Sequence, residues 1–201
     1  MTRRASAVAQ TRRRIVDATR ELHTEQGIAA TSWDDIAARA GVGVGTVYRH
    51  FPSLDDLVPA CGEVSMELVA LPGPDTAAAL FDGLQTPAER IARLVREAFE
   101  IYERGSRELQ VVRREPEAHP SVAEAGKALE ASLSALVVSA LEPLDADPQD
   151  HAVTRAMIDL NTWEALRSAG LDAAATVTAV SGMLTARIEC PRQESNLEPS
   201  D

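Results

Sequence analysis

The sequence predicts an all-α protein in which a small N-terminal unit of three helices precedes a larger helical bundle. Apolar residues recur at helical spacing along nearly the whole chain, and glycines and prolines fall mostly between those stretches. No stretch alternates apolar and polar residues between turn signals, as a half-buried strand would. Hydrophobic residues make up 45% of the 201 residues but aromatic ones only 3%. We therefore expect a core of Ala, Leu, Val and Ile.

The first two helices have clear end signals. Residues 11–26 have helical periodicity, with Ile15 on the apolar face, and Gly27 follows where a C-terminal cap belongs. Ser32 and Asp35 have the spacing of a capping box, in which each side chain satisfies a backbone N–H of the other. A second, short helix is therefore expected after Ser32.

The next two helices follow a tight glycine turn, Gly41-Val-Gly43. A third short helix over residues 44–51 is ended by Pro52, and Ser53 then caps a fourth helix that runs to about residue 69. Pro59 lies near the second turn of that helix and is a potential kink.

Residues 71–74, Leu-Pro-Gly-Pro, form the clearest break in the chain. Beyond them, further helices are predicted over residues 87–105, 108–114, 121–141, 150–168 and 172–188. We expect a helix-turn-helix domain at residues 1–58, a helical domain at 59–189, and a polar, disordered tail at 190–201.

The formal charge of -11 argues against a nucleic-acid partner only when it is averaged over the whole chain. Residues 1–60 hold 8 Lys and Arg against 7 Asp and Glu, whereas residues 61–201 hold 12 against 24. Five arginines precede Ile15 with no acidic residue among them. The first segment therefore carries a basic arm, and the acidity belongs to the second.

Several classes of protein are disfavoured. No apolar run approaches the ~20 residues that span a bilayer, and the arginine-rich start is unlike a signal peptide. Cys61 and Cys190 stand alone, which favours two thiols in a reducing compartment over a bridge. The four histidines, His23, His50, His119 and His151, have no partners at metal-ligand spacing. We expect a cytoplasmic protein without metal, cofactor or membrane association.

Residues 32–51 have the pattern of a helix-turn-helix, whose second helix can lie in a DNA major groove. An αα-hairpin with a glycine turn also occurs in helical proteins that bind no DNA. The run Gly41-Val-Gly-Val-Gly45 partly imitates a dinucleotide-binding loop, but it follows a helical segment instead of the strand which that loop requires.

The motif Ile36-Ala-Ala-Arg-Ala-Gly-Val42, followed by Gly45-Thr-Val-Tyr-Arg-His-Phe51, resembles the signature of the TetR family of transcriptional regulators. The resemblance extends over residues 31–57, and with the first helix it covers about the first sixty residues. The rest of the chain is similar to the family only in helical layout and length. Such regulators bind operator DNA as homodimers, with one helix-turn-helix for each half-site.

The resemblance implies a set of DNA contacts. Val44, Gly45 and Thr46 would lie nearest base edges, Tyr48, His50 and Ser32 would hold phosphates, and Arg49 could take either role. Trp33, Ile36, Val47 and Phe51 would be core. Two positions depart from the family pattern, because Val44 and Leu54 are apolar where the family often has basic or polar residues. Arg12 and Arg13 of the basic arm could supply phosphate contacts instead.

The resemblance also implies that the second domain binds a small molecule and forms the dimer through its last two helices, here about residues 150–168 and 172–188. The candidate interface residues are Trp163, Leu166, Val177, Val180 and Leu184, with ordinary core as the alternative. The candidate ligand residues are Phe99, Tyr102, Val112, Met157, Asn161 and Trp163, with Arg113 or His119 as polar contacts.

Three functions are compared on this basis. The first is a ligand-responsive repressor that releases operator DNA when it binds a small molecule. The second is a helical adaptor with lost or weak DNA binding, which the apolar Val44 and Leu54 make plausible. The third is an all-helical enzyme, for which the sequence offers no nucleophile-base pair and no metal set.

Overall fold

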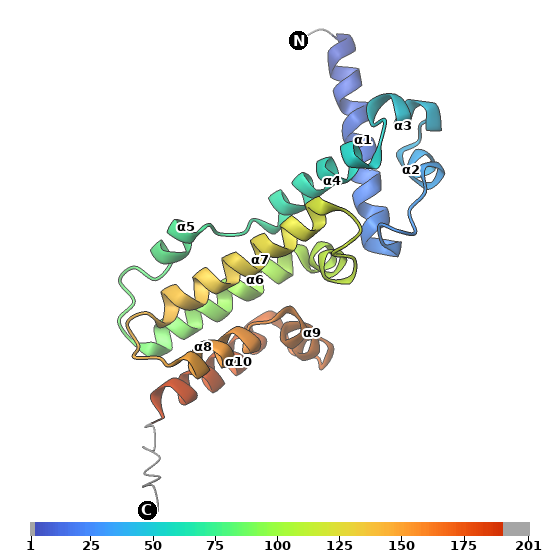
Figure 1. The fold of residues 1–201 in the computed structure, drawn as a ribbon. Helices are drawn as coiled ribbons and strands as arrows, with labels where there is room; N and C mark the ends of the chain where they lie inside the picture. Colours follow the sequence, from blue (N-terminus) through green and yellow to red (C-terminus); the bar gives the residue numbers. More distant parts are fainter. Residues whose placement is uncertain (1–2, 191–201) are drawn as a thin grey trace, which may run out of the picture. The chain divides into compact units, whose positions relative to one another are not determined.

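The structure is a computed structural model that describes residues 3–190 (Figure 1). The described residues form ten helices and no strand, so the all-α prediction is confirmed. In chain order the helices are α1 (Arg3–Gln26), α2 (Trp33–Ala40), α3 (Val44–His50), α4 (Leu54–Val69), α5 (Pro74–Ala79), α6 (Pro87–Arg114), α7 (Pro120–Leu141), α8 (Pro148–Met157), α9 (Leu160–Ser168) and α10 (Ala173–Glu189). The predicted tail beyond Cys190 lies outside the described residues.

The helices divide into two compact units. Unit 1 takes the chain up to Gly73 together with Glu100–Leu133, so it joins α1–α4 to one end of α6 and one end of α7. Unit 2 takes Pro74–Phe99 and the chain from Ser134 onward. The two long helices α6 and α7 each contribute to both units, which a linear division of the sequence does not show.

The core of unit 1 is built beneath the three N-terminal helices and the start of α4. It is almost entirely aliphatic, and its one ring is that of Phe51. Its buried members are Ile15, Val16, Ala18, Leu22, Ile36, Ala37, Ala40, Val47, Phe51, Leu57, Ala60 and Cys61. The predicted core positions Ile36, Val47 and Phe51 are thereby confirmed, and Trp33 packs against the same cluster while half-buried.

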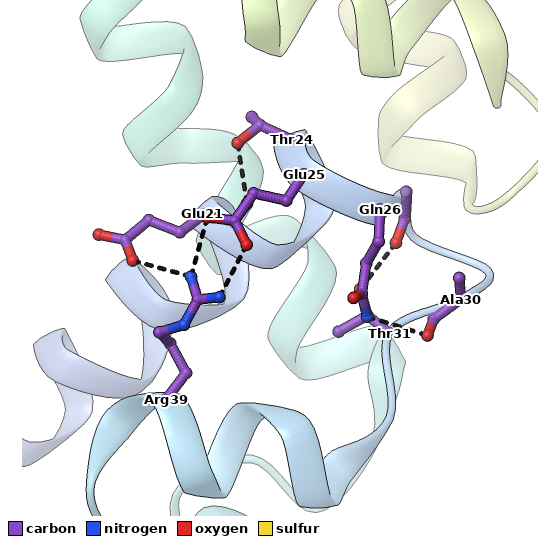
Figure 2. A network of polar contacts seen from close by, with 8 residues as sticks. Glu21, Thr24, Glu25, Gln26, Ala30, Thr31 and Arg39 are labelled. Atoms are coloured by element: carbon purple, nitrogen blue, oxygen red, sulfur yellow. Dashed lines mark hydrogen bonds and ion pairs between the residues drawn. The ribbon is translucent and has the colours of Figure 1, made fainter.

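Arg39 joins α2 to α1 through two carboxylates, as Figure 2 shows. Its guanidinium donates to Glu21 at 3.2 Å and to both oxygens of Glu25 at 3.1 and 2.7 Å. The hydrogen bond from Arg39 lowers the pKa of Glu25. All three side chains are partly exposed, so the network orients α2 more than it stabilises the fold.

Gly105 interrupts α6 and lets it approach α4. Its φ of -145° and ψ of 28° are not helical, which accounts for the predicted break between residues 105 and 108, although the helix resumes at once. A Cβ at this position would overlap the side chain of Val69. A glycine is therefore required where the two helices meet.

The predicted helix over residues 150–168 is wrong in one respect, because it is two helices. α8 ends at Met157, and the buried Ile158 and the half-buried Asp159 turn the chain before α9 begins at Leu160. The Asp159 carboxylate accepts from the N–H of Asn161 at 3.0 Å and so starts the second helix. The sequence does not reveal this break, because the helical spacing of apolar residues continues across Asp159 and because Asp also occurs within helices.

Arg90 holds together three segments of unit 2. Its guanidinium is buried, lies over the Phe81 ring at 5.3 Å and donates to the carbonyls of Ser139 and Ala140 at 2.5 and 2.9 Å. It also donates to the carbonyls of Phe81 and Leu84 at 3.2 and 3.1 Å. These carbonyls lie near the end of α7 and in the turn after α5, so Arg90 supplies donors to backbone acceptors where a helix and a turn end.

Three further observations concern the chemistry available to the chain. Among the described residues, no helix is long and apolar enough to cross a bilayer. The same residues hold no group of His, Cys, Asp or Glu arranged to bind a metal ion. Both cysteines are thiols: Cys61 is buried in unit 1, and Cys190 is exposed.

Candidate nucleic-acid interface

The turn between α2 and α3 is formed as the sequence predicts. Ser32 Oγ accepts from the N–H of Asp35 at 3.1 Å, and the Asp35 carboxylate accepts from the N–H of Ser32 at 3.1 Å, which completes the capping box. At the other end of α2, Gly41 adopts φ 63° and ψ 42°, a left-handed conformation that favours glycine. The N–H of Val42 then bonds the carbonyl of Ala37 at 3.0 Å. The chain is thereby turned into α3.

Arg14 closes the end of α2. Its Nη2 donates to the carbonyls of Ala40 and, at 3.1 Å, of Gly41, two acceptors that the helix itself leaves without a donor. Although Arg14 belongs to the basic arm predicted from the sequence, its guanidinium is held by the protein. Its charge also complements the negative end of the α2 dipole.

α3 has one buried face and one exposed face. Val47 is fully buried, and Phe51, directly after the helix, is 1% exposed. On the other face, Val44 and Tyr48 are 38% and 45% exposed. The predicted contact residues Gly45 and Arg49 are also exposed, whereas Thr46 and His50 are half-buried. The outer face of α3 therefore exposes four of these six residues, while Thr46 and His50 are partly accessible.

Several of the predicted DNA contacts also support one another. The Tyr48 ring lies 4.8 Å from the Trp33 ring, centroid to centroid, which fixes the direction of its hydroxyl. Arg49 Nη2 donates to Thr46 Oγ1 at 3.3 Å. Ser32 remains exposed, but its hydroxyl is engaged with Asp35 in the capping box.

A Cβ added at Gly43 or Gly45 would meet no atom within 4 Å. These two glycines are therefore not required by packing inside the protein. Their small size leaves the backbone at the start of α3 open to close approach by another molecule.

Arg12 and Arg13 lie on the exposed side of α1. The Arg12 guanidinium lies 4.6 Å from the centre of the Phe51 ring, a cation–π contact that places its charge beside the end of α3. Arg13 Nε lies 3.9 Å from an Asp17 carboxylate oxygen, and both side chains are exposed, so this pair is weak. Both arginines are available to an approaching phosphate.

The six candidate ligand residues are divided between the units. Phe99, Met157, Asn161 and Trp163 belong to unit 2, while Tyr102 and Val112 belong to unit 1. Of the candidate polar contacts, Arg113 is exposed. His119 Nε2 donates to Asp55 Oδ1 at 3.1 Å, and its Nδ1 lies 2.8 Å from Ser121 Oγ.

Unit 1 contains a cavity of about 440 Å³ that sequence reasoning did not predict. It lies among α1, α4, α6 and α7, and of the predicted ligand residues it is lined by Val112. The sequence signal that could have located it is the set of polar residues His23, Cys61 and Glu108 on otherwise apolar helix faces. Residues from four helices come together there, which periodicity within single helices does not show.

Two pairs of polar side chains meet at the wall of this cavity. Arg20 Nη1 bonds Glu108 Oε1 at 2.6 Å, and His23 Nδ1 lies 3.8 Å from Cys61 Sγ. Desolvation lowers the pKa of His23 to about 4, although the charge of Glu115 raises it in part. Desolvation raises the pKa of the Cys61 thiol to about 12. At neutral pH the imidazole and the thiol are therefore both uncharged.

The candidate dimer residues differ in exposure within the chain. Trp163, Val180 and Leu184 are 8%, 0% and 1% exposed, so each is covered by its own unit. Leu166 and Val177 are half-buried. Met183, which was not among the candidates, is 51% exposed on α10.

A capped short helix, a left-handed glycine turn and a second short helix with an exposed outer face define a helix-turn-helix protein. Residues 15–61 match the sequence model of the bacterial regulatory proteins of the tetR family. This segment is therefore similar to the DNA-binding part of the TetR family.

Relatives matched by sequence are regulators of the same type. The transcriptional regulator AcrR of Shigella flexneri is 39% identical over 66 residues, which cover 32% of this chain and 31% of that protein. The repressor KstR of Mycolicibacterium smegmatis is 37% identical over 92 residues, which cover 45% and 43%. The chain thus spans less than half the length of the curated relatives it matches.

The fold of the whole chain also has solved counterparts. A TetR-like regulator from Rhodococcus sp. has a TM-score of 0.61 at 17% identity and covers 89% of this chain and 95% of its own. The TetR-like regulator LfrR of Mycobacterium smegmatis, solved in complex with proflavine, has a TM-score of 0.52 at 25% identity and covers 90% and 97%. The arrangement of an N-terminal helix-turn-helix before a helical C-terminal part is therefore shared with this family.

Proposed function

We propose that this protein is a ligand-responsive DNA-binding regulator that acts as a homodimeric repressor in the cytoplasm and releases operator DNA when a small molecule binds. Residues 1–58 recognise DNA, and residues 59–189 serve effector binding and dimerisation. The observation that carries the proposal is the outer face of α3, where Val44, Tyr48 and Arg49 are exposed. The opposite face is held in the core by the buried Val47 and Phe51.

The DNA contacts follow from that face. Val44, Gly45 and Thr46 lie at the start of α3, where a recognition helix meets base edges, and Val44 can contact a thymine methyl. Tyr48, Arg49 and His50 hold phosphates together with Ser32, Arg12 and Arg13. Phosphate contacts of this kind position the protein, and the base contacts supply specificity.

The response to a ligand is supported by the relatives. LfrR was solved with proflavine, and a structure of the multidrug binding protein EbrR contains imidazole. In this chain a ligand would favour a dimer geometry in which the two recognition helices no longer match grooves ~34–36 Å apart. The ligand must bind the two geometries with different affinity for this to occur. No step of this function makes or breaks a covalent bond, so we propose that the protein is not an enzyme.

The test is fluorescence anisotropy with duplex DNA from upstream of the gene that encodes the protein and a shuffled duplex as the control. We expect a clear preference for the upstream DNA. Tyr48→Ala and Arg49→Ala should each weaken binding at least about fivefold, as expected for a lost contact worth ~1–3 kcal/mol. Arg96→Ala, an exposed arginine on α6, is the matched control and should not change binding.

The alternative is a helical adaptor with weak or lost DNA binding. It is favoured by Val44 and Leu54, which are 38% and 49% exposed and offer no charge to a phosphate. Equal and weak binding to the upstream and shuffled duplexes, unchanged in Tyr48→Ala and Arg49→Ala, would support the adaptor and contradict the regulator.

A further inference from the structure

The cavity of unit 1 is lined by α1 and α4, the two helices that share a core with the helix-turn-helix. α1 and α4 form one part of its wall, and α6 and α7 form another. We propose that this cavity is the effector site and that its ligand is an apolar organic cation. The inference rests on the proposed ligand-responsive function and adds to it the place and the chemical class of the ligand.

The size and the wall of the cavity suit one small organic molecule. Its volume of about 440 Å³ falls within the range of ~300–1,000 Å³ typical of ligand pockets. Most of the wall is aliphatic. The apolar lining includes Ile28, Val58, Met66, Val111, Val112 and Val122. An apolar body of the ligand would therefore be desolvated against matching surface.

The charges of the lining favour a cation. Arg20 and Glu108 cancel each other across 2.6 Å, and the deeply buried His23 is uncharged at neutral pH. The other two charged residues of the lining are Glu63 and Glu124, which are both exposed. Neither has an ion-pair partner among residues 3–190, so the lining carries uncompensated negative charge. A recess lined by charge of one sign raises the local concentration of the opposite ion and disfavours ions of its own sign.

Binding here would act on the helix that supports DNA recognition. Arg20 and His23 of α1 line the cavity. On the same helix, Arg12 lies over the ring of Phe51, directly after α3, and Ile15 shares the core with Val47 of α3. Beyond the Arg20–Glu108 pair, the end of α6 is held by Glu115. The Glu115 carboxylate accepts from the N–H groups of Ile28 and Ala29, in the turn after α1, at 3.1 and 2.9 Å. A ligand between α1 and α6 would therefore affect these contacts directly, because all of them lie within unit 1.

The test compares tetraphenylphosphonium with tetraphenylborate, two ions of nearly equal size and opposite charge, by calorimetric titration of the DNA-free full chain in sodium buffer. We expect the cation to bind at least tenfold more tightly than the anion. The double variant Glu63→Gln/Glu124→Gln should weaken cation binding at least fivefold. Glu67→Gln/Glu117→Gln, two exposed glutamates outside the lining, is the matched control and should leave it unchanged.

A second variant tests the location. A Cβ at Gly62 would meet no atom within 4 Å, and Gly62 lines the cavity from α4, so Gly62→Leu should fill space without a clash at the Cβ. It should abolish binding of tetraphenylphosphonium. Equal affinity for the two ions, a double variant that behaves like its control, or full binding by Gly62→Leu would each overturn the proposal.

The link to DNA is measured separately, so that the two proposals can fail independently. Tetraphenylphosphonium should release the upstream duplex from the wild-type protein and not from Gly62→Leu. A cation that binds in the cavity but leaves DNA binding unchanged would overturn its assignment as the effector site. A protein that binds the cation but never discriminates the upstream duplex would contradict the regulator function alone.

Discussion

Burial sets the protonation state of His23, and the same residue therefore links stability to pH. It is 6% exposed, and desolvation lowers the pKa of its imidazole to about 4. The unfolded chain binds a proton near pH 6.5, whereas the folded chain does so only near pH 4. The neutral imidazole thus contributes stability fully above pH 6.5, and this contribution is lost as the pH falls toward 4.

His23→Gln should be less sensitive to acid than the wild type. The wild-type free energy of unfolding should fall by about 2–3 kcal/mol more between pH 7.5 and 4.5 than that of the variant, because a pKa shift of one unit corresponds to ~1.4 kcal/mol. Urea titrations at the two pH values measure the difference. His151→Gln, at a half-buried position on α8, is the control. An identical pH dependence in wild type and His23→Gln would rule out this effect.

Arg12 and Arg13 give the second prediction at this scale. If each neutralises a phosphate, the double variant Arg12→Ala/Arg13→Ala should lower the slope of log affinity against log salt by about 2, because each lost contact removes ~0.9 from it. The slope is measured by anisotropy over a series of salt concentrations. An unchanged slope would show that neither arginine contacts a phosphate.

At the scale of helices, the contact between α4 and α6 depends on two backbone positions. Gly105 permits the close approach of Val69, and Ala70 ends α4 with φ 51°, a left-handed conformation that costs a residue with a Cβ ~1–2 kcal/mol. The Arg104 guanidinium donates to the carbonyl of Val69 at 3.1 Å and so fixes this end of α4.

The two positions should respond in opposite ways to substitution. Gly105→Ala should destabilise the protein by ~1–3 kcal/mol, since overpacking forces the neighbouring helix to move. Ala70→Gly should stabilise it by ~0.5–1 kcal/mol, because the left-handed conformation is no longer strained. Urea unfolding of both variants measures these changes. A stabilised Gly105→Ala would show that α4 and α6 can separate at no cost.

At the scale of the whole molecule, the proposed dimer requires an apolar surface that the monomer leaves open. Val180 and Leu184 are occupied within the chain, whereas Met183 on the same helix is 51% exposed. Small neighbours such as Gly182 would allow a second helix to approach closely. Met183 is therefore the residue of α10 best placed to anchor a partner copy.

Met183→Lys should shift the protein from dimer to monomer, because a buried lysine without a counter-charge is strongly disfavoured at an interface core. Light scattering coupled to size-exclusion chromatography at several concentrations measures the mass. Val138→Lys on α7, at a position that is 55% exposed, is the control and should leave the mass unchanged. A dimer that persists in Met183→Lys would place the interface elsewhere.

The sequence by itself determined the features that depend on neighbours along the chain. The capping box of Ser32 and Asp35, the left-handed Gly41 and the buried faces of α2 and α3 are local, because caps, turns and periodicity each involve residues within a few positions. The family resemblance lies in the same segment. The divided helix at Ile158 and Asp159 escaped prediction, since helical periodicity continues across it.

Only the tertiary structure decided which distant residues meet. The ion pair of Arg20 with Glu108 joins two residues that are 88 positions apart in the chain. The contact of His23 with Cys61 and the cavity beside them also bring together helices that are distant in the sequence. The capping of α2 by Arg14 is of the same kind. Such contacts are set by how helices pack, and many packings are compatible with one apolar periodicity.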